Sequence, residues 1–320
     1  MSTLHLALPA PRRAPVRGPV AAALVALIAV ACSPASTPTA TGSPGPSSPP
    51  SAVPSASPSD VSTTGAIEHK TGATDVILRI ESGGGFVPID FLATQAPTFT
   101  LYGDGVIVFQ PKVEAFPQPD AGGVTKGVPW RTAKLDEGQI QELLQFALGP
   151  GGLGGARETY MANGVADAPS TIFTVHAGGL DKTVSVNALS EETQPGPDAV
   201  ARAAFLKLAS RLQDFDEGGR IATDVYVPDR YRGVLIEREA QPGVEPLAWP
   251  WTDIPFAEFK EGPQDGSGPT TFPHRTLTVA ETAALKLDGI EGGAQGIAIK
   301  ASDGKIYGLV LRPLLADETE

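Results

Sequence analysis

A low-complexity stretch near the start of the sequence limits what this chain can fold into. Residues 33–64 are almost entirely Ser, Pro, Thr, Ala and Gly, and Asp60 is their only charged residue. Such a segment buries too little apolar surface to offset the entropy lost on ordering. Its prolines favour extended backbone. The packed core must therefore come from the roughly 250 residues that follow.

Residues 1–31 have the composition of a secretory signal peptide. Three arginines and no acidic residue precede an apolar run of about a dozen residues. The run is shorter than the roughly 20 apolar residues of a membrane-spanning helix. It ends at Cys32, the only cysteine of the chain. The stretch 28–32 resembles the lipobox of bacterial lipoprotein signals, although Ala29 stands where leucine is commonest.

The lipobox resemblance implies that cleavage makes Cys32 the first residue of a lipoprotein. Lipid on its sulfur and amino terminus would anchor the chain to the extracytoplasmic face of the cell membrane. Residues 32–66 would then be the lipidated cysteine and a disordered tether, reaching into the cell envelope. Plain secretion and an uncleaved anchor are the alternatives. With Cys32 lipidated, the fold has no disulfide and depends on its hydrophobic core.

The charge balance bears on the class of partner. The chain has 24 basic and 36 acidic residues, and removing residues 1–31 leaves 21 basic residues against the same 36 acidic ones, a net charge of −15. An acidic protein lacks the cationic surface that binds phosphate backbones, so we expect no nucleic-acid partner. The glycine-rich runs 82–85 and 149–155 lack the Gly-Lys-Ser/Thr ending of a phosphate loop. We accordingly predict no cofactor.

Strand signals in the rest of the chain occur mainly as hairpins with glycine-containing turns. The predicted hairpins join 98–102 to 106–109, 171–175 to 183–186, and 296–300 to 305–311. Further strands are expected at 76–80, 223–227 and 233–237. Residues 240–275 are rich in Pro and Gly and are expected to be mostly loop.

Helix signals lie between these strands. One helix is predicted from an Asp136 cap to the Gly149-Pro150 stop, with an apolar face of Ile140, Leu143, Leu144 and Ala147. A second, over 198–212, has the face Ala201, Phe205, Leu208 and Leu212. Thr278 and Glu281 form a capping box that opens a third, short helix. The order favours an α+β fold of antiparallel sheets with helices packed on one face, in two subdomains, 67–218 and 219–320.

The stretch from Val76 to about Asp214 resembles a bacterial domain family of unknown function found in secreted and lipid-anchored proteins. The shared features are the Tyr-Gly-Asp-Gly turn at 102–105, a Leu-rich helix, the hairpin over 172–186 and a closing helix. With its 311–315 ending, the whole chain is similar to uncharacterised lipoproteins of high-GC bacteria. The resemblance implies a location in the envelope and no particular activity.

No strong catalytic or metal signature is present, and we name no catalytic residue. His69, His176 and His274 lie in separate segments, and no Gly-x-Ser-x-Gly elbow occurs. Scattered histidines without a free thiol do not suggest zinc. The best acidic cluster for calcium is Asp214, Asp216 and Glu217, a weak candidate because it lacks the spacing of a calcium loop.

The aromatic run near the end of the loop-like stretch is a candidate partner-binding surface. Aromatic rings anchor interfaces and stack on sugars. The alternative is that the rings pack into the core of the second subdomain. The candidate residues are Trp249, Trp251, Phe256 and Phe259.

These observations favour a lipid-anchored, extracytoplasmic binding module whose partner is an envelope protein or a wall polymer. A secreted hydrolase acting on cell-wall glycans or peptides is one alternative, because 36 acidic residues always offer some carboxylate pair. A structural or inhibitory surface domain is another.

Overall fold

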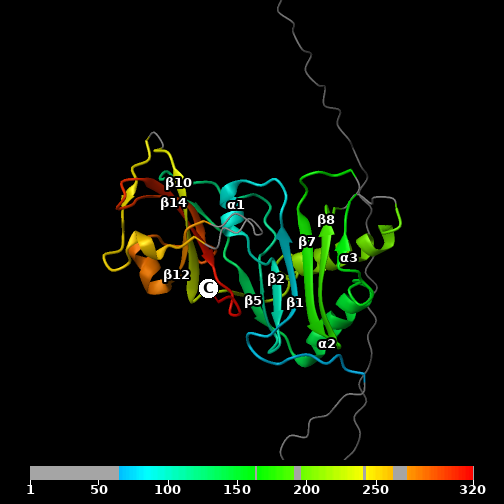
Figure 1. Ribbon diagram of the computed structural model, residues 1–320. Coiled ribbons are helices and arrows are strands. Elements are labelled where there is room, and N and C mark those ends of the chain that lie inside the picture. Colours follow the sequence, from blue (N-terminus) through cyan, green and yellow to red (C-terminus); the bar gives the residue numbers. More distant parts are fainter. Residues whose placement is uncertain (1–64, 163, 191–195, 241–242, 262–271, 320) are drawn as a thin grey trace, which may run out of the picture. The chain divides into compact units, whose positions relative to one another are not determined.

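The computed structural model describes residues 65–319 except 163, 191–195, 241–242 and 262–271 (Figure 1). The predicted signal peptide, Cys32 and nearly all of the predicted tether lie outside the described residues. Residues 61–320 form one compact unit. Among the described residues, no helix combines the length and apolar character needed to cross a membrane.

The first sheet has eight strands in the order β6-β8-β7-β1-β2-β3-β5-β9. All neighbouring strands are antiparallel except β6 and β8, which are parallel. Hairpins account for the pairs β7–β8 and β2–β3, as the glycine-containing turns predict. The bounds are β1 Val76–Gly83, β2 Phe99–Tyr102, β3 Val106–Phe109, β5 Arg131–Lys134, β6 Thr159–Tyr160, β7 Ser170–Ala177, β8 Leu180–Asn187 and β9 Asp224–Val225.

Two helices, α2 (Glu137–Leu148) and α3 (Ala199–Gln213), cover this sheet and lie beside β7 and β8 (Figure 1). Asp136 and Gln139 form a reciprocal capping box at the start of α2. The apolar faces predicted for both helices pack against the inward side chains of the strands. Phe205 on α3 is fully buried, and its ring contacts those of Tyr160 and Phe173.

The second sheet follows the order β11-β13-β14-β10-β12, and β4 also pairs with β13. Its two long hairpin strands, β13 and β14, are joined through the predicted turn at 302–304. The bounds are β4 Thr125–Lys126, β10 Arg230–Arg238, β11 Leu247–Ala248, β12 His274–Thr278, β13 Ala294–Lys300 and β14 Ile306–Pro313. The described part of residues 240–275, which leaves out 241–242 and 262–271, contains the short strand β11 and the start of β12.

The second sheet is packed on both faces. One face carries the larger core, built around Leu235, Leu277 and Leu309. On the opposite face Val234, Ile236 and Val310 pack with Ala93 of α1 (Ile89–Thr94), which contacts β14. The short helix α4 (Val279–Thr282) begins with the predicted Thr278–Glu281 capping box and continues into a 3-10 turn, Ala283–Leu285, while a second 3-10 turn spans Phe256–Glu258. The α+β class with antiparallel sheets is therefore confirmed.

The two sheets exchange short strands across the expected subdomain border at 218/219. The early strand β4 pairs with β13 of the second sheet, while the late strand β9 pairs with β5 of the first. All other strands stay with the half of the sequence in which they occur. The division into 67–218 and 219–320 remains a prediction that describes most, but not all, of the strand pairing.

Candidate functional site

Two arginines lie directly opposite each other in the second sheet. The antiparallel register of β10 and β14 pairs Arg232 with Arg312. Because side chains two residues apart share a face of a strand, both arginines lie on the face that carries Val234 and Val310. Beneath α1 this face of the sheet is apolar. It becomes cationic two residues away, where Arg232 on β10 faces Arg312 on β14.

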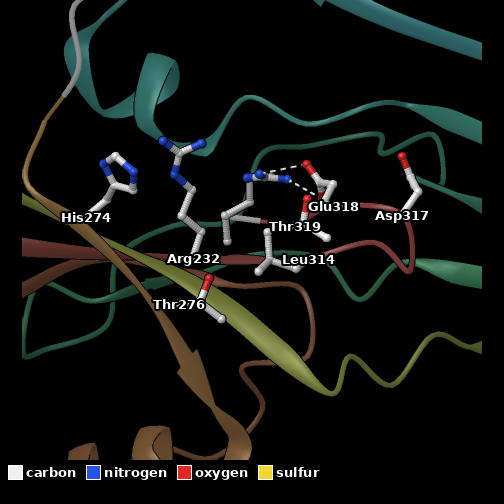
Figure 2. Close-up of a pocket in the computed structure, with 8 residues that line it drawn as sticks. Arg232, His274, Thr276, Leu314, Asp317, Glu318 and Thr319 are labelled. Carbon is white, nitrogen blue, oxygen red and sulfur yellow. Dashed lines mark hydrogen bonds and ion pairs between the residues drawn. The ribbon is translucent and has the colours of Figure 1, made fainter. Parts of the chain in front are cut away.

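The neighbouring strand β12 adds polar groups to the same face. Its register places Thr276 opposite Arg232 and His274 opposite Val234. Nδ1 of His274 lies 2.8 Å from the carbonyl oxygen of Phe272, a hydrogen bond that orients the ring. Three adjacent strands therefore line one side of a cavity of about 300 Å³ (Figure 2). The 314–319 segment closes the other side with Leu314, Asp317, Glu318 and Thr319.

Glu318 neutralises Arg312. The guanidinium is almost fully buried and donates two hydrogen bonds to the carboxylate, from Nη1 at 3.0 Å and from Nη2 at 2.8 Å. The backbone N–H of Leu315 donates a third, at 2.8 Å. Bidentate arginine–carboxylate pairs are among the stronger hydrogen-bonded contacts in proteins. This pair fixes both the buried arginine and the 314–319 segment.

Asp317 ties the same segment to the first sheet. Its carboxylate accepts hydrogen bonds from Nη2 of Arg79 on β1, at 2.7 Å, and from the hydroxyl of Tyr102 on β2, at 2.6 Å. Burial, together with this hydrogen bond, raises the pKa of Tyr102 well above its usual range, so the phenol stays a donor. Burial also raises the pKa of the nearby Glu81, where the charge of Arg79 opposes the shift.

Arg232 lacks the neutralisation that Arg312 receives. No ion pair of Arg232 occurs among the residues that the structure describes, and its buried Nε has no hydrogen-bond partner there. Burial, and then the adjacent Arg312, lower the pKa of Arg232, and Glu318 only partly offsets them. In Figure 2 the guanidinium of Arg232 lies on the side of His274, away from Glu318. Like charges directly opposite each other destabilise a sheet.

The arginine donors of this wall are of the kind that suits an anion. Arginine keeps its charge at any physiological pH, and its planar fork of donors matches phosphate and carboxylate oxygens. Thr276 lies directly opposite Arg232 on β12, and His274 lies two residues further along the same face of that strand. An anion placed against the guanidinium of Arg232 would offset the like-charge repulsion between the two arginines.

The aromatic residues proposed from the sequence lie in the core of the second sheet. Trp251 and Phe259 are only 6% and 5% exposed, and Trp249 and Phe256 pack partly buried beside them. The ring centroids of Trp249 and Trp251 are 5.1 Å apart, and both indole N–H groups donate to backbone carbonyls. The expectation of an exposed aromatic contact surface is therefore wrong for Trp251 and Phe259, because both rings are used in packing.

The weak calcium candidates do not gather around a common point. Asp214 accepts a hydrogen bond from the backbone N–H of Gly218, at 3.1 Å, and Glu217 pairs with Arg220, at 3.1 Å. Asp216 lies between them in the turn after α3. Within the described residues, no group of three or more His, Cys, Asp or Glu side chains has the arrangement of a metal site.

The three histidines have different surroundings. His69 lies 3.3 Å from Glu137 at the start of α2, and His176 lies 2.9 Å from Asp181 across the β7–β8 hairpin. His274 alone among the three lines the arginine cavity. The arrangement offers no observation that favours the hydrolase alternative.

No protein-family model matches this chain, and no curated protein or solved structure is significantly similar to it. The candidate site therefore rests on its own geometry. Arg232 and Arg312 are not among the site residues predicted from the sequence. The sequence feature that could have indicated them is an arginine inside each of two apolar runs, 231–236 and 309–315. Charged residues in such runs are seldom buried unless paired.

Proposed function

We propose that this chain is a lipid-anchored extracytoplasmic protein that binds a ligand carrying a phosphate or carboxylate group. The group would enter the 300 Å³ cavity and meet Arg232. The observation that carries the proposal is the in-register pair of Arg232 and Arg312, to which the structure supplies a single bidentate carboxylate. A wall polymer or an envelope protein that bears such groups fits the expected partner class.

The energetics support a binding role over a purely structural one. A half-buried arginine without a counterion lowers stability, and an apolar side chain of similar size is often neutral or better at such a position. A bound anion changes this balance, since a hydrogen bond to a charged group contributes about 1.5–3 kcal/mol. The arrangement of Arg232 is thus unfavourable when the cavity is empty and favourable when it holds an anion.

Because the overall charge is negative, attraction between the protein and an anion can arise only at short range, inside the cavity. The chain carries a net charge of −12, which repels anions at long range. Attraction must therefore come from hydrogen bonds made inside the cavity. We expect moderate salt to weaken binding far less than it weakens attachment to a polybasic surface.

Calorimetric titration of the full chain carrying Cys32→Ala tests the proposed site, with inorganic phosphate, methyl phosphate and acetate as probes. Arg232→Met should weaken binding at least tenfold, equivalent to about 1.4 kcal/mol. Arg230→Met is the matched control, because Arg230 lies on the same strand but pairs with Asp229 outside the cavity. Equal affinities in the two variants, or no binding of any probe, would overturn the proposed site.

The anchoring part of the proposal rests on residues 1–32 of the sequence. Cys32→Ala should release the protein from membranes or stop cleavage of its precursor. Fractionation of cells expressing each form measures both effects. Unchanged membrane retention together with unchanged cleavage would contradict the anchor.

A further inference from the structure

We propose that the ligand of the arginine cavity is an anionic amphiphile, with its charged group at Arg232 and a single apolar chain in a second, adjoining cavity. This inference rests on the proposed function and specifies its ligand. The chemical class is an alkyl or acyl chain ending in a phosphate or carboxylate.

The second cavity is the larger one, with a volume of about 430 Å³. One molecule of liquid water takes about 30 Å³, so this space corresponds to about a dozen groups of that size. Its lining comes from α1, from the 110–117 loop, and from the adjoining parts of both sheets. Among the apolar side chains that line it are Phe91, Val113, Phe116, Val128, Trp130 and Pro313.

Arg312 belongs to the walls of both cavities. Its charge is neutralised by Glu318, so the shared wall is a fixed ion pair and not an unmet cation. Two consecutive residues of the polypeptide line different cavities: Pro313 lines the apolar cavity and Leu314 lines the cationic one. A molecule with a charged end and an apolar end matches this change in chemistry.

Exposed apolar surface at the second cavity supports an apolar occupant. Phe91 is 48% exposed, Val113 37% and Phe116 83%, although all three line the cavity. Large exposed apolar groups gathered at a concave surface mark binding sites. A hydrophilic polymer would leave these side chains in water, and a neutral hydrocarbon would leave Arg232 unmatched.

Alkyl phosphates of increasing length test the inference, titrated below their micelle concentrations into the full chain carrying Cys32→Ala. Each methylene that is fully buried contributes about 0.8 kcal/mol, or three- to fourfold in affinity. From methyl to octyl phosphate we expect at least a 100-fold increase in affinity. Arg232→Met should weaken every member of the series by a similar factor, and octanol should bind far more weakly than octyl phosphate.

Two valine variants locate the apolar chain. Val113→Asp should remove most of the dependence of affinity on chain length. Val200→Asp is the control, because Val200 is 85% exposed on α3 and does not line the cavity. We expect Val200→Asp to bind the series with the affinities of the wild type. We expect the affinity of Val113→Asp to lose its dependence on chain length.

The outcomes separate this inference from the proposed function. Methyl phosphate binding without any gain from longer chains would overturn the amphiphile and leave the anion site standing. Absence of binding by every phosphate would overturn both. Tight octyl phosphate binding that Val113→Asp does not change would place the chain elsewhere and overturn the inference. Sedimentation with phosphatidylglycerol vesicles, without binding of free octyl phosphate, would indicate a bilayer contact and overturn it too.

Discussion

The two sheets are covered on their second faces in different ways. In the first sheet, the face away from the helices packs Tyr102 and Val108 against Trp130 and Leu315, and Arg79 on this face is paired with Asp317. In the second, the corresponding face changes from Val234 and Val310 to two opposed arginines. The 314–319 segment contacts both sheets, by apolar packing and the Arg79–Asp317 ion pair on the first and by the Arg312–Glu318 ion pair on the second. The comparison places the proposed anion contact where a sheet face carries opposed charges in place of apolar packing.

The largest effect is expected from core truncation in each half. Phe205→Ala in the first sheet should lower the free energy of unfolding by about 3–5 kcal/mol, and Leu309→Ala in the second by about 2–5 kcal/mol. Urea titration followed by circular dichroism measures both. Because residues 61–320 form one compact unit, each variant should shift the same single transition.

Two transitions, one moved by Phe205→Ala and the other by Leu309→Ala, would contradict a single cooperative unit. That result would instead support the two subdomains expected from the sequence.

Loss of the Glu318 carboxylate should have the next largest effect. Glu318→Ala leaves Arg312 buried beside Arg232 without a counterion, and we expect a loss of about 2–3 kcal/mol. Chemical denaturation checks it. Thr319→Ala, a change at the exposed next residue, is the control and should stay within about 0.5 kcal/mol of wild type. If Glu318→Ala were as stable as this control, the Arg312–Glu318 ion pair would not stabilise the fold.

The capping box of the second sheet should show a pH-dependent effect of intermediate size. Partial burial raises the pKa of Glu281, but hydrogen bonds from Arg275 and Thr278 outweigh it, so the net pKa is lowered. A carboxyl with a lowered folded-state pKa contributes stability above its unfolded pKa and loses it as pH falls through the folded one.

Glu281→Gln should therefore cost about 1 kcal/mol at neutral pH, with the difference from wild type shrinking below about pH 4. Thermal unfolding measured across pH 3–7 tests this sign. Glu245→Gln, at an exposed glutamate, should follow the wild-type profile throughout. A cost for Glu281→Gln that stays constant at all pH values would assign the effect to packing and not to the carboxylate charge.

Replacement of the unpartnered arginine should have the smallest effect on stability. Arg232→Met removes the like-charge contact with Arg312, which is worth roughly 0.2–1 kcal/mol, so the protein should be equally or slightly more stable. Thermal unfolding without added anions is the measurement. Destabilisation by more than about 2 kcal/mol would show that Arg232 holds the fold together and would weaken the comparison between the two sheets.

The sequence predicted those helices and strands that have a local pattern of apolar residues or turn glycines. The 3.6-residue spacing in α2 and α3 and the glycine turns of the hairpins fix those elements locally. The two-residue strands β4 and β11 exist only because a distant strand lies beside them, whereas β9 lies within the strand predicted at 223–227. Helix α1 has six residues, too few to show a period. Strands β4 and β11 and helix α1 were beyond the reach of local reasoning.

The candidate site depended on register, which local patterns do not give. Arg232 and Arg312 are eighty residues apart, and only the pairing of β10 with β14 brings them opposite each other. The aromatic run was visible, but its burial depends on the core of the second sheet, to which distant strands contribute. Composition therefore drew attention to the rings, while the less conspicuous arginines form the cavity wall.

The exchange of β4 and β9 between the sheets has a consequence for how this chain can change over evolutionary time. A recombination that moved only residues 219–320 would remove β9 from its place beside β5 and would leave β13 without β4. Neither half could be grafted onto another protein without a new partner for an exposed strand edge. The two sheets must therefore be inherited together, as one indivisible module.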